Sequence, residues 1–177
     1  MSELALTRIY QGWAASIQGE HERSIALIRS GLADWNNPMA VGSSILAEAC
    51  LRAGRYQEAM DAVAACRAHA ARSEDHSADS EVERVAGEAL ILMDAENTTE
   101  AEQCLRHAAA VAAEQGAKSW ELRAATSLGR LLRDTGRRDE ARATLAEIYG
   151  WFTEGFGTAD LKEAKALLDQ LEGRAAP

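Results

Sequence analysis

The chain has 177 residues and a formal net charge of −9, an acidic balance that excludes general binding to nucleic acid. Ala and Leu together account for 55 residues, whereas Val and Ile together account for only 12. Because Ala and Leu favour helices and β-branched residues favour strands, this composition predicts an all-α fold.

Turn signals divide the chain into helical hairpins. In chain order, helices are expected at 3–18 and 20–34, 38–53 and 55–72, 79–94 and 98–115, 117–134 and 137–149, with a last helix at 159–172. Asn36-Asn37-Pro38 marks the start of the third helix, because Pro is favoured in a first helical turn. The last helix begins with a capping-box pattern, Asp160 and Glu163, and is expected to cap an array that spans one domain, residues 1–177.

The hairpins share one internal pattern. Their turns, at Gly19, Gly54, Glu96 and Gly136, are 35, 42 and 40 residues apart. A small residue lies seven positions before each turn and another five positions after it, and the residue nine positions after it is aliphatic. The first small position is held by Gly12, Ala47, Ala89 and Gly129. Small side chains let two helices approach closely, so these positions are expected to be helix contacts.

This pattern resembles the tetratricopeptide repeat (TPR) family. The stretches LAEACLRAGRYQEAMDAV (46–63) and SLGRLLRDTGRRDEARATL (127–145) carry the family's spacing of small residues about a turn. The resemblance covers about residues 3–149 and implies a superhelix of about four hairpins plus a C-terminal capping helix. Gln11 and Glu88 stand where the family usually has a large apolar residue, and the third turn lacks Gly.

Residues 116–171 also resemble the C-terminal arm of a bacterial signalling family. The stretch WFTEGF, followed by DLKEAKALL, carries this likeness. In that family a class III nucleotide cyclase or winged-helix module precedes a signal-transduction ATPase, and a TPR-like array closes the chain. The resemblance implies the helical arm of such a protein or a stand-alone relative, and it transfers no catalytic residues.

In a TPR array the first helix of each hairpin lines a concave groove, so the resemblance implies a set of lining residues. Counting from the small positions, these are Ile9, Trp13, Leu51, Leu90, Met93, Arg123, Arg130 and Arg133. A groove that is apolar at one end and Arg-rich at the other suits a peptide with apolar anchors followed by acidic groups. Alternatively, the arginines pair within the chain, with Glu121, Asp134 or the acid-rich stretch 74–102.

The sequence predicts no cofactor, no metal and no enzymatic activity. The stretch 116–119 lacks the Gly-Lys adjacency of a phosphate-binding loop, and helix caps explain it better. Cys66 and His69 are helical neighbours, but two ligands do not close a metal site. With no apolar run near the ~18 residues that span a bilayer and no signal-peptide pattern, we expect a cytoplasmic chain without a membrane partner. Cys50 and Cys66 are expected to pack between helices as reduced thiols.

The expected function is non-catalytic protein–protein interaction, as the regulatory or sensory arm of a bacterial signal-transduction or transcription-control assembly. The partner would be a protein or peptide, an acidic one included, or a neighbouring ATPase or cyclase module. The alternative is a structural module that forms a homodimer and has no separate ligand. The aromatic segment YGWFTEGFG (149–157) is expected to anchor the last helix, with an exposed docking knob as the alternative.

Overall fold

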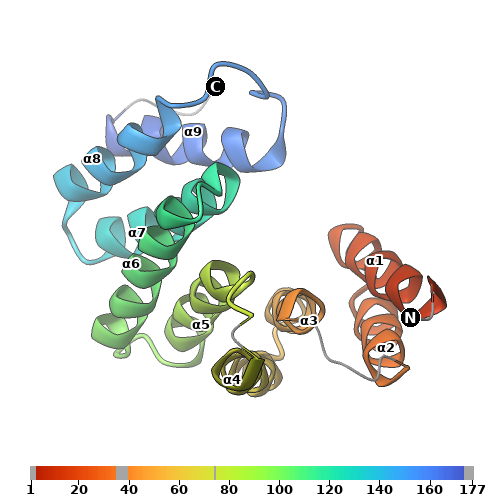
Figure 1. Ribbon diagram of the computed structural model, residues 1–177. Coiled ribbons are helices and arrows are strands. Elements are labelled where there is room, and N and C mark those ends of the chain that lie inside the picture. Colours follow the sequence, from red (N-terminus) through yellow and green to blue (C-terminus); the bar gives the residue numbers. More distant parts are fainter. Residues whose placement is uncertain (1–2, 35–39, 74, 174–177) are drawn as a thin grey trace.

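The chain folds into a curved array of paired helices (Figure 1). The computed structural model describes residues 3–34, 40–73 and 75–173, and within these ranges it contains nine α-helices and no strand. The helices are α1 (Glu3–Ile17), α2 (His21–Ala33), α3 (Ala40–Arg52), α4 (Tyr56–Ser73), α5 (Asp79–Met93), α6 (Thr98–Glu114), α7 (Lys118–Asp134), α8 (Arg138–Tyr149) and α9 (Ala159–Leu171). The predicted all-α array of four hairpins and a final helix is confirmed. The expected helix start at Asn36-Asn37-Pro38 lies outside the described residues.

Consecutive helices pack against each other as hairpins, and the hairpins stack along an arc. α1 packs on α2, α3 on α4, α5 on α6 and α7 on α8, while α9 packs on both α7 and α8. The first helices of the hairpins also contact one another in the order α1, α3, α5, α7. These four helices therefore form a continuous inner layer, with α1 and α9 at the two ends of the arc (Figure 1).

In three of the four hairpins, the first helix is followed by a glycine in the turn. Gly19, Gly54 and Gly136 follow α1, α3 and α7 with φ of 80°, 71° and 82°, a conformation that glycine adopts without steric penalty. After Gly54, for example, the backbone N–H of Arg55 donates to the Cys50 carbonyl at 2.9 Å, which satisfies the helix end. Tight turns of this kind return the second helix of each hairpin onto the first.

The turn between α5 and α6 is built differently. It has no glycine and spans four residues, 94–97, where the other hairpin turns span three. Asp94 leaves the helix in an extended conformation, with φ of −156° and ψ of 121°. Asn97 then donates from its side-chain amide to the Leu90 carbonyl at 3.3 Å, which satisfies a helix-end acceptor without glycine.

This longer turn changes the repeat register of α5. A Cβ added at Gly12 would lie 2.8 Å from the Ser24 carbonyl oxygen, so Gly12 marks a close approach of α1 and α2. In the third hairpin the equivalent contact is made by Gly87, whose added Cβ would lie 3.0 Å from the Ala101 carbonyl oxygen. The expectation that Ala89 holds this position is therefore wrong by two residues. One extra residue in α5 and one in the turn after it account for the shift.

Small side chains dominate the interior. The buried residues form one cluster that runs from α2 to α5 and a second that runs from α6 to α9. Fully buried alanines such as Ala47 and Ala86 allow the helices to approach closely. Cys50 and Cys66 lie in the first cluster, as predicted, and burial raises the pKa of the Cys66 thiol to about 11.

Candidate functional site: the inner groove

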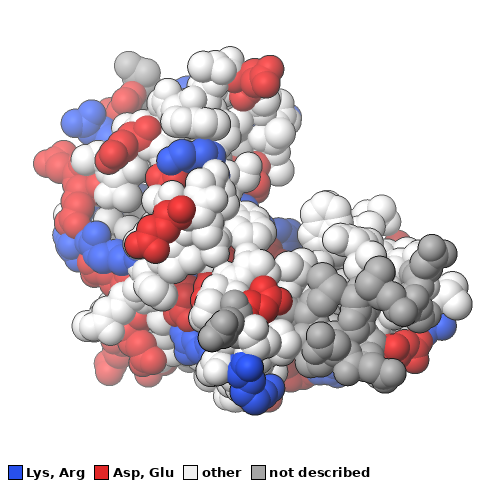
Figure 2. Space-filling view, viewed as in Figure 1, with Lys and Arg blue, Asp and Glu red and all other residues white. Residues whose placement is uncertain are grey.

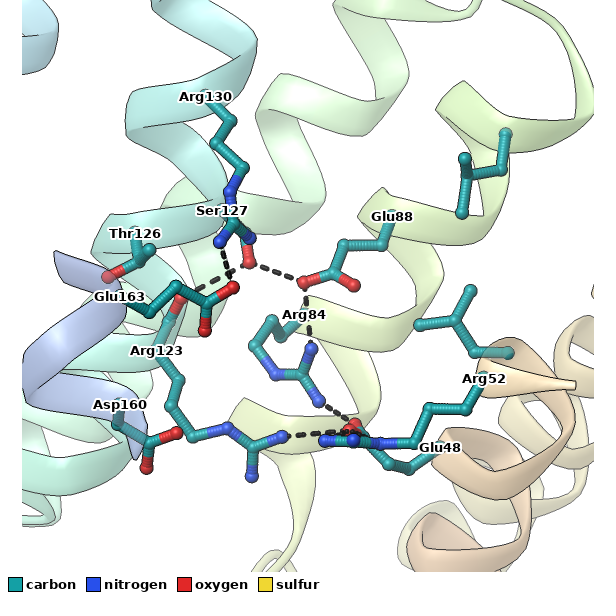
Figure 3. A pocket seen from close by; sticks show the side chains of 12 residues that line it. Glu48, Arg52, Arg84, Glu88, Arg123, Thr126, Ser127, Arg130, Asp160 and Glu163 are labelled. Atoms are coloured by element: carbon teal, nitrogen blue, oxygen red, sulfur yellow. Dashed lines mark hydrogen bonds and ion pairs between the residues drawn. The ribbon is translucent and has the colours of Figure 1, made fainter. Parts of the chain in front are cut away.

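The inner layer encloses a cavity of about 310 Å³, which we call the inner groove. Figure 2 shows the molecule hollowed between the arm that carries α1 and the arm that carries α9. The lining side chains come from α3, α5, α7 and α9 (Figure 3), and they are Glu48, Leu51, Arg52, Arg84, Glu88, Leu92, Arg123, Thr126, Ser127, Arg130, Asp160 and Glu163. Most of these side chains are charged, and both acidic and basic groups are present, whereas the expected groove was apolar at one end and Arg-rich at the other.

Buried ion pairs form the floor of the groove. The side chain of Arg84 on α5 is only 4% exposed, and its guanidinium contacts Glu48 on α3. Within α5, Arg84 also contacts Glu88 at 2.8 Å and Glu81 at 3.2 Å. Arg123 on α7 binds two of these three carboxylates, Glu48 at 3.0 Å (Figure 3) and Glu81 at 2.6 Å. A single charge network therefore joins three consecutive hairpins.

The network keeps its buried groups ionised. Burial by itself would raise the pKa of Glu48, but the positive charges of Arg84, Arg123 and Arg52 outweigh it and lower this pKa to about 2. Burial also opposes the charged form of Arg84, yet the nearby carboxylates, led by that of Glu88, raise its pKa. Each charge is tolerated in the interior only because its counter-ions are in place.

Two of the arginines predicted to receive a ligand already hold carboxylates of this chain. Arg123 is part of the network just described, and one of its partners, Glu81, belongs to the acid-rich stretch. Arg130, about two turns further along α7, contacts Glu163 on α9 (Figure 3). These contacts are of the kind foreseen by the alternative interpretation, in which the arginines pair within the chain.

Arg133 also contacts side chains of this chain. Its guanidinium donates to the neighbouring carboxylate of Asp134 at 2.7 Å and to the side-chain carbonyl of Gln170 at 2.8 Å. Glu121, the other partner considered, instead pairs with Lys118 at 2.6 Å. Each of the three predicted arginines is thus paired within the chain, and Arg133 does not line the inner groove.

The apolar residues predicted to line the groove are dispersed. Ile9 is only 3% exposed and packs against Gly31 in the interior between α1 and α2. Leu51 is buried but lies in the groove floor. Leu90 is half-buried against the C-terminal core cluster, and Met93 is exposed beside the turn that ends α3. Ile9, Leu90 and Met93 therefore do not line the inner groove.

The misplaced register of α5 explains why sequence reasoning missed Arg84 and Glu88. The lining positions lie three residues before, one after and four after the small residue of each first helix. Counted from Gly87 rather than Ala89, these positions are Arg84, Glu88 and Ile91. Arg84 and Glu88 line the inner groove, and Ile91 lines the pocket next to it. A signal was present in the sequence, because Gly87 is itself a small residue and its register places the lone arginine of the acid-rich stretch on the inner face.

Beyond the inner groove, at the N-terminal end of the inner layer, α1 carries an exposed apolar face. Trp13 does not line the cavity itself, but it directly follows Gly12 and so holds on α1 the position that the groove residue Glu88 holds after Gly87 on α5. Tyr10 and Ile17 lie one turn to either side of it on the same face of the helix. The exposed fractions of Tyr10, Trp13 and Ile17 are 51%, 48% and 57%. We call these three residues the α1 wall.

A second cavity of about 500 Å³ opens beside the inner groove. It shares Glu88, Leu92, Ser127 and Arg130 with the groove, and its remaining lining is largely apolar. The lining residues are Gly87, Glu88, Ile91, Leu92, Ala95, Thr98, Leu105, Ser127, Arg130, Leu131, Asp134 and Thr135. Leu92, which is 52% exposed, separates the two cavities with an accessible apolar side chain.

The aromatic segment before α9 is partly packed and partly exposed. Phe152 and Tyr149 pack against the C-terminal core cluster, which fixes the segment on the last hairpin. Trp151 lies edge-on to Phe152 with 5.2 Å between ring centroids, yet its own side chain stays exposed, as does that of Phe156. The anchoring interpretation thus holds for the first pair and the exposed interpretation for the second.

Two other kinds of site are absent from the part of the chain that the structure describes. In 3–34, 40–73 and 75–173, no group of three or more His, Cys, Asp or Glu side chains is arranged to hold a metal ion. None of the helices described is long and apolar enough to cross a membrane.

Comparison with solved structures identifies the fold. Two crystal structures of the nearly identical TPR-like repeats of a proposed kinesin light chain from Podosopora anserina superpose with a TM-score of 0.67 at 17% and 16% identity. In both, 98% of this chain is covered, together with 89% and 90% of the other chain. A thermophilic TPR protein from Thermus thermophilus superposes with a TM-score of 0.58 at 19% identity, over 97% of this chain and 91% of the other. The chain therefore has a TPR-like fold. No family model and no curated protein sequence matches it.

Proposed function

We propose that this chain is a non-catalytic protein-interaction array whose inner groove binds a segment of a partner protein. TPR-like repeats generally mediate protein–protein interaction, and the fold is of this type. The observation that carries the proposal is the placement of exposed apolar side chains. Tyr10, Trp13 and Ile17 on α1 and Leu92 on α5 are large, about half exposed, and carried by helices of the inner layer, and Leu92 also lines the inner groove. Apolar surface gathered in a concavity is typical of a docking site.

The setting of this interaction is a finer part of the same proposal. The likeness of residues 116–171 to the C-terminal arm of bacterial cyclase and ATPase signalling proteins supports a regulatory role in a cytoplasmic signalling or transcription-control assembly. In that role the groove would hold either a separate protein or a neighbouring module of the same assembly. A second copy of this chain would be a homodimeric occupant of the same surface.

The proposal is tested by substituting one exposed residue on each face of α1. Trp13→Glu places a charge in the α1 wall, while Leu4→Glu places the same charge nine residues earlier, half a helical turn away around the axis. Leu4 is exposed, so neither change enters the core. Proteins captured from a bacterial extract by the immobilised wild-type chain and by the two variants are compared by mass spectrometry, with circular dichroism as the check on folding.

Retention of a specific partner by wild type and Leu4→Glu, together with its loss from folded Trp13→Glu, is the expected result. Equal capture by all three chains would remove the groove as the binding surface. A variant in which Arg123, Arg130 and Arg133 are all reversed to Glu would be a poor substitute, because it breaks ion pairs that hold α3, α5, α7 and α9 together.

A further inference from the structure

We infer that the segment bound in the inner groove is cationic as well as apolar, with aliphatic or aromatic side chains for the α1 wall and a lysine or arginine for the carboxylate of Asp160. This inference rests on the proposed function and specifies the chemistry of the partner. It reverses the expectation of an acidic ligand, which assumed that the arginines of the groove are available.

The arginines of the groove are already occupied. Arg52 pairs with Glu48 at 2.8 Å, and Arg84 and Arg123 share Glu48 and Glu81 between them. Arg130 contacts Glu163. An incoming carboxylate would therefore have to displace a carboxylate that the fold itself supplies. For Arg84 and Arg123 the displaced group would be left buried beside other acids, which is strongly unfavourable.

The charge left over in the groove is negative. Asp160 lines the groove from the first turn of α9 and makes no hydrogen bond or ion pair with any residue that the structure describes. Figure 3 shows its carboxylate at the edge of the cavity, on the side of Arg123. Counting the network partner Glu81, five carboxylates face four guanidinium groups here, namely Glu48, Glu81, Glu88, Asp160 and Glu163 against Arg52, Arg84, Arg123 and Arg130. A cation would complete this balance, and an anion would worsen it.

The α1 wall and Asp160 lie on opposite sides of the concave face of the arc. The α1 wall is at one end of the arc and α9 at the other, with the charged floor of α3, α5 and α7 between them (Figure 1). A segment that spans the concavity would thus present its apolar residues to Tyr10, Trp13 and Ile17 and its cationic residue to Asp160. The net charge of −9 on the whole chain favours the approach of such a segment.

A phage library of random linear peptides provides an unbiased test. Peptides are selected on the immobilised wild-type chain, and those that also bind Trp13→Glu are removed, so that only groove-dependent binders are sequenced. The most enriched peptides are then synthesised and titrated by fluorescence anisotropy against wild type, Asp160→Asn and Asp139→Asn. Asp139 is a matched control, because it is the second residue of α8 as Asp160 is of α9, it is exposed, and it does not line the groove.

We expect groove-dependent binders that combine aliphatic or aromatic residues with Lys or Arg. Asp160→Asn should weaken their binding about tenfold, as loss of one charge-assisted contact predicts. Asp139→Asn should leave the affinity within a factor of about two, because Asp139 does not line the groove and its charge is screened by salt. Both variants change the net charge equally, so a general charge effect would appear in both. Binders that are acidic, or that bind Asp160→Asn as tightly as wild type, would overturn this inference while leaving the interaction function intact. A selection that yields no groove-dependent binder would overturn both.

Discussion

The α1 wall and the groove floor occupy equivalent positions of successive repeats and carry opposite chemistry. On α1 the inner residue after the small position is Trp13, which is exposed, whereas on α3 and α5 it is Glu48 and Glu88, which lie in a buried charge network. Charges that pair across helices hold the repeats in register, and apolar groups without cover are available to a partner. This difference is the basis on which we propose a role in stability for the floor and a role in recognition for the α1 wall.

The largest effect that would test this division is expected from Arg84→Met. The substitution keeps most of the side-chain volume but removes one of the two guanidinium groups that the buried carboxylates of Glu48 and Glu81 share, and leaves them with Arg123. Breaking a buried pair from one side typically lowers the free energy of unfolding by about 3–5 kcal/mol. Urea denaturation followed by circular dichroism measures the loss.

Arg106→Met is the control for that experiment. Arg106 contacts Glu102 and Glu140 at the surface, where ion pairs contribute about 0–1 kcal/mol. If Arg84→Met and Arg106→Met destabilised the chain equally, the floor would have no special role in stability.

The pH dependence of stability sharpens the same point through Glu48. Its pKa is about 2 in the folded chain against an ordinary value of 4.5, so folding favours the ionised form. The resulting stabilisation is complete above pH ~4.5 and is lost as the pH falls towards ~2, and it amounts to about 3 kcal/mol. Glu48→Gln should therefore be destabilised relative to wild type at neutral pH, and the gap should shrink by about that amount on acidification. A gap that stays constant from pH ~7 to pH ~2 would show that Glu48 is not held by the network.

Local patterns were sufficient to predict the fold, because each helix end has a local cause. Gly19, Gly54 and Gly136 end their helices with a positive φ, which the glycine in the sequence predicts, and the small residues around them mark the helix contacts. The contacts within the groove could not be predicted in this way. Its decisive contacts join Glu48 to Arg84, 36 residues later in the chain, and to Arg123, 75 residues later.

The error in α5 has a specific physical origin. Asp94 and Asn97 build a turn without glycine that is one residue longer, and α5 itself has one extra residue after Gly87, so counting back from the turn reached Ala89 instead of Gly87. Once the register is corrected, the spacing rule does find Arg84 and Glu88. What it could not find is which charges pair, because this depends on how far the arc curves.

A smaller effect is expected from Gly87→Ala, which tests the equivalence of α1 and α5 on which the comparison depends. The new Cβ would lie 2.7 Å from Leu105 Cγ and 3.0 Å from the Ala101 carbonyl oxygen. Overpacking costs about 1–3 kcal/mol, and the better helix propensity of Ala returns up to about 1 kcal/mol, so a net loss of about 1–2 kcal/mol is expected. Gly157→Ala, with nothing within 4 Å of its added Cβ, should be neutral in the same thermal or urea melt. A neutral Gly87→Ala would mean that α5 and α6 do not meet at this residue.

The smallest effect on stability is expected where the effect on recognition is large. Ile17 is 57% exposed at the end of α1, so Ile17→Gln removes little apolar surface from the interior and should change the free energy of unfolding by less than about 1 kcal/mol. The same substitution should weaken the groove-dependent peptides, because it removes one of the three apolar side chains of the α1 wall. Urea denaturation and fluorescence anisotropy on the same preparation measure the two effects. A loss of several kcal/mol would place Ile17 in the packed interior, and the wall would then serve stability as the floor does.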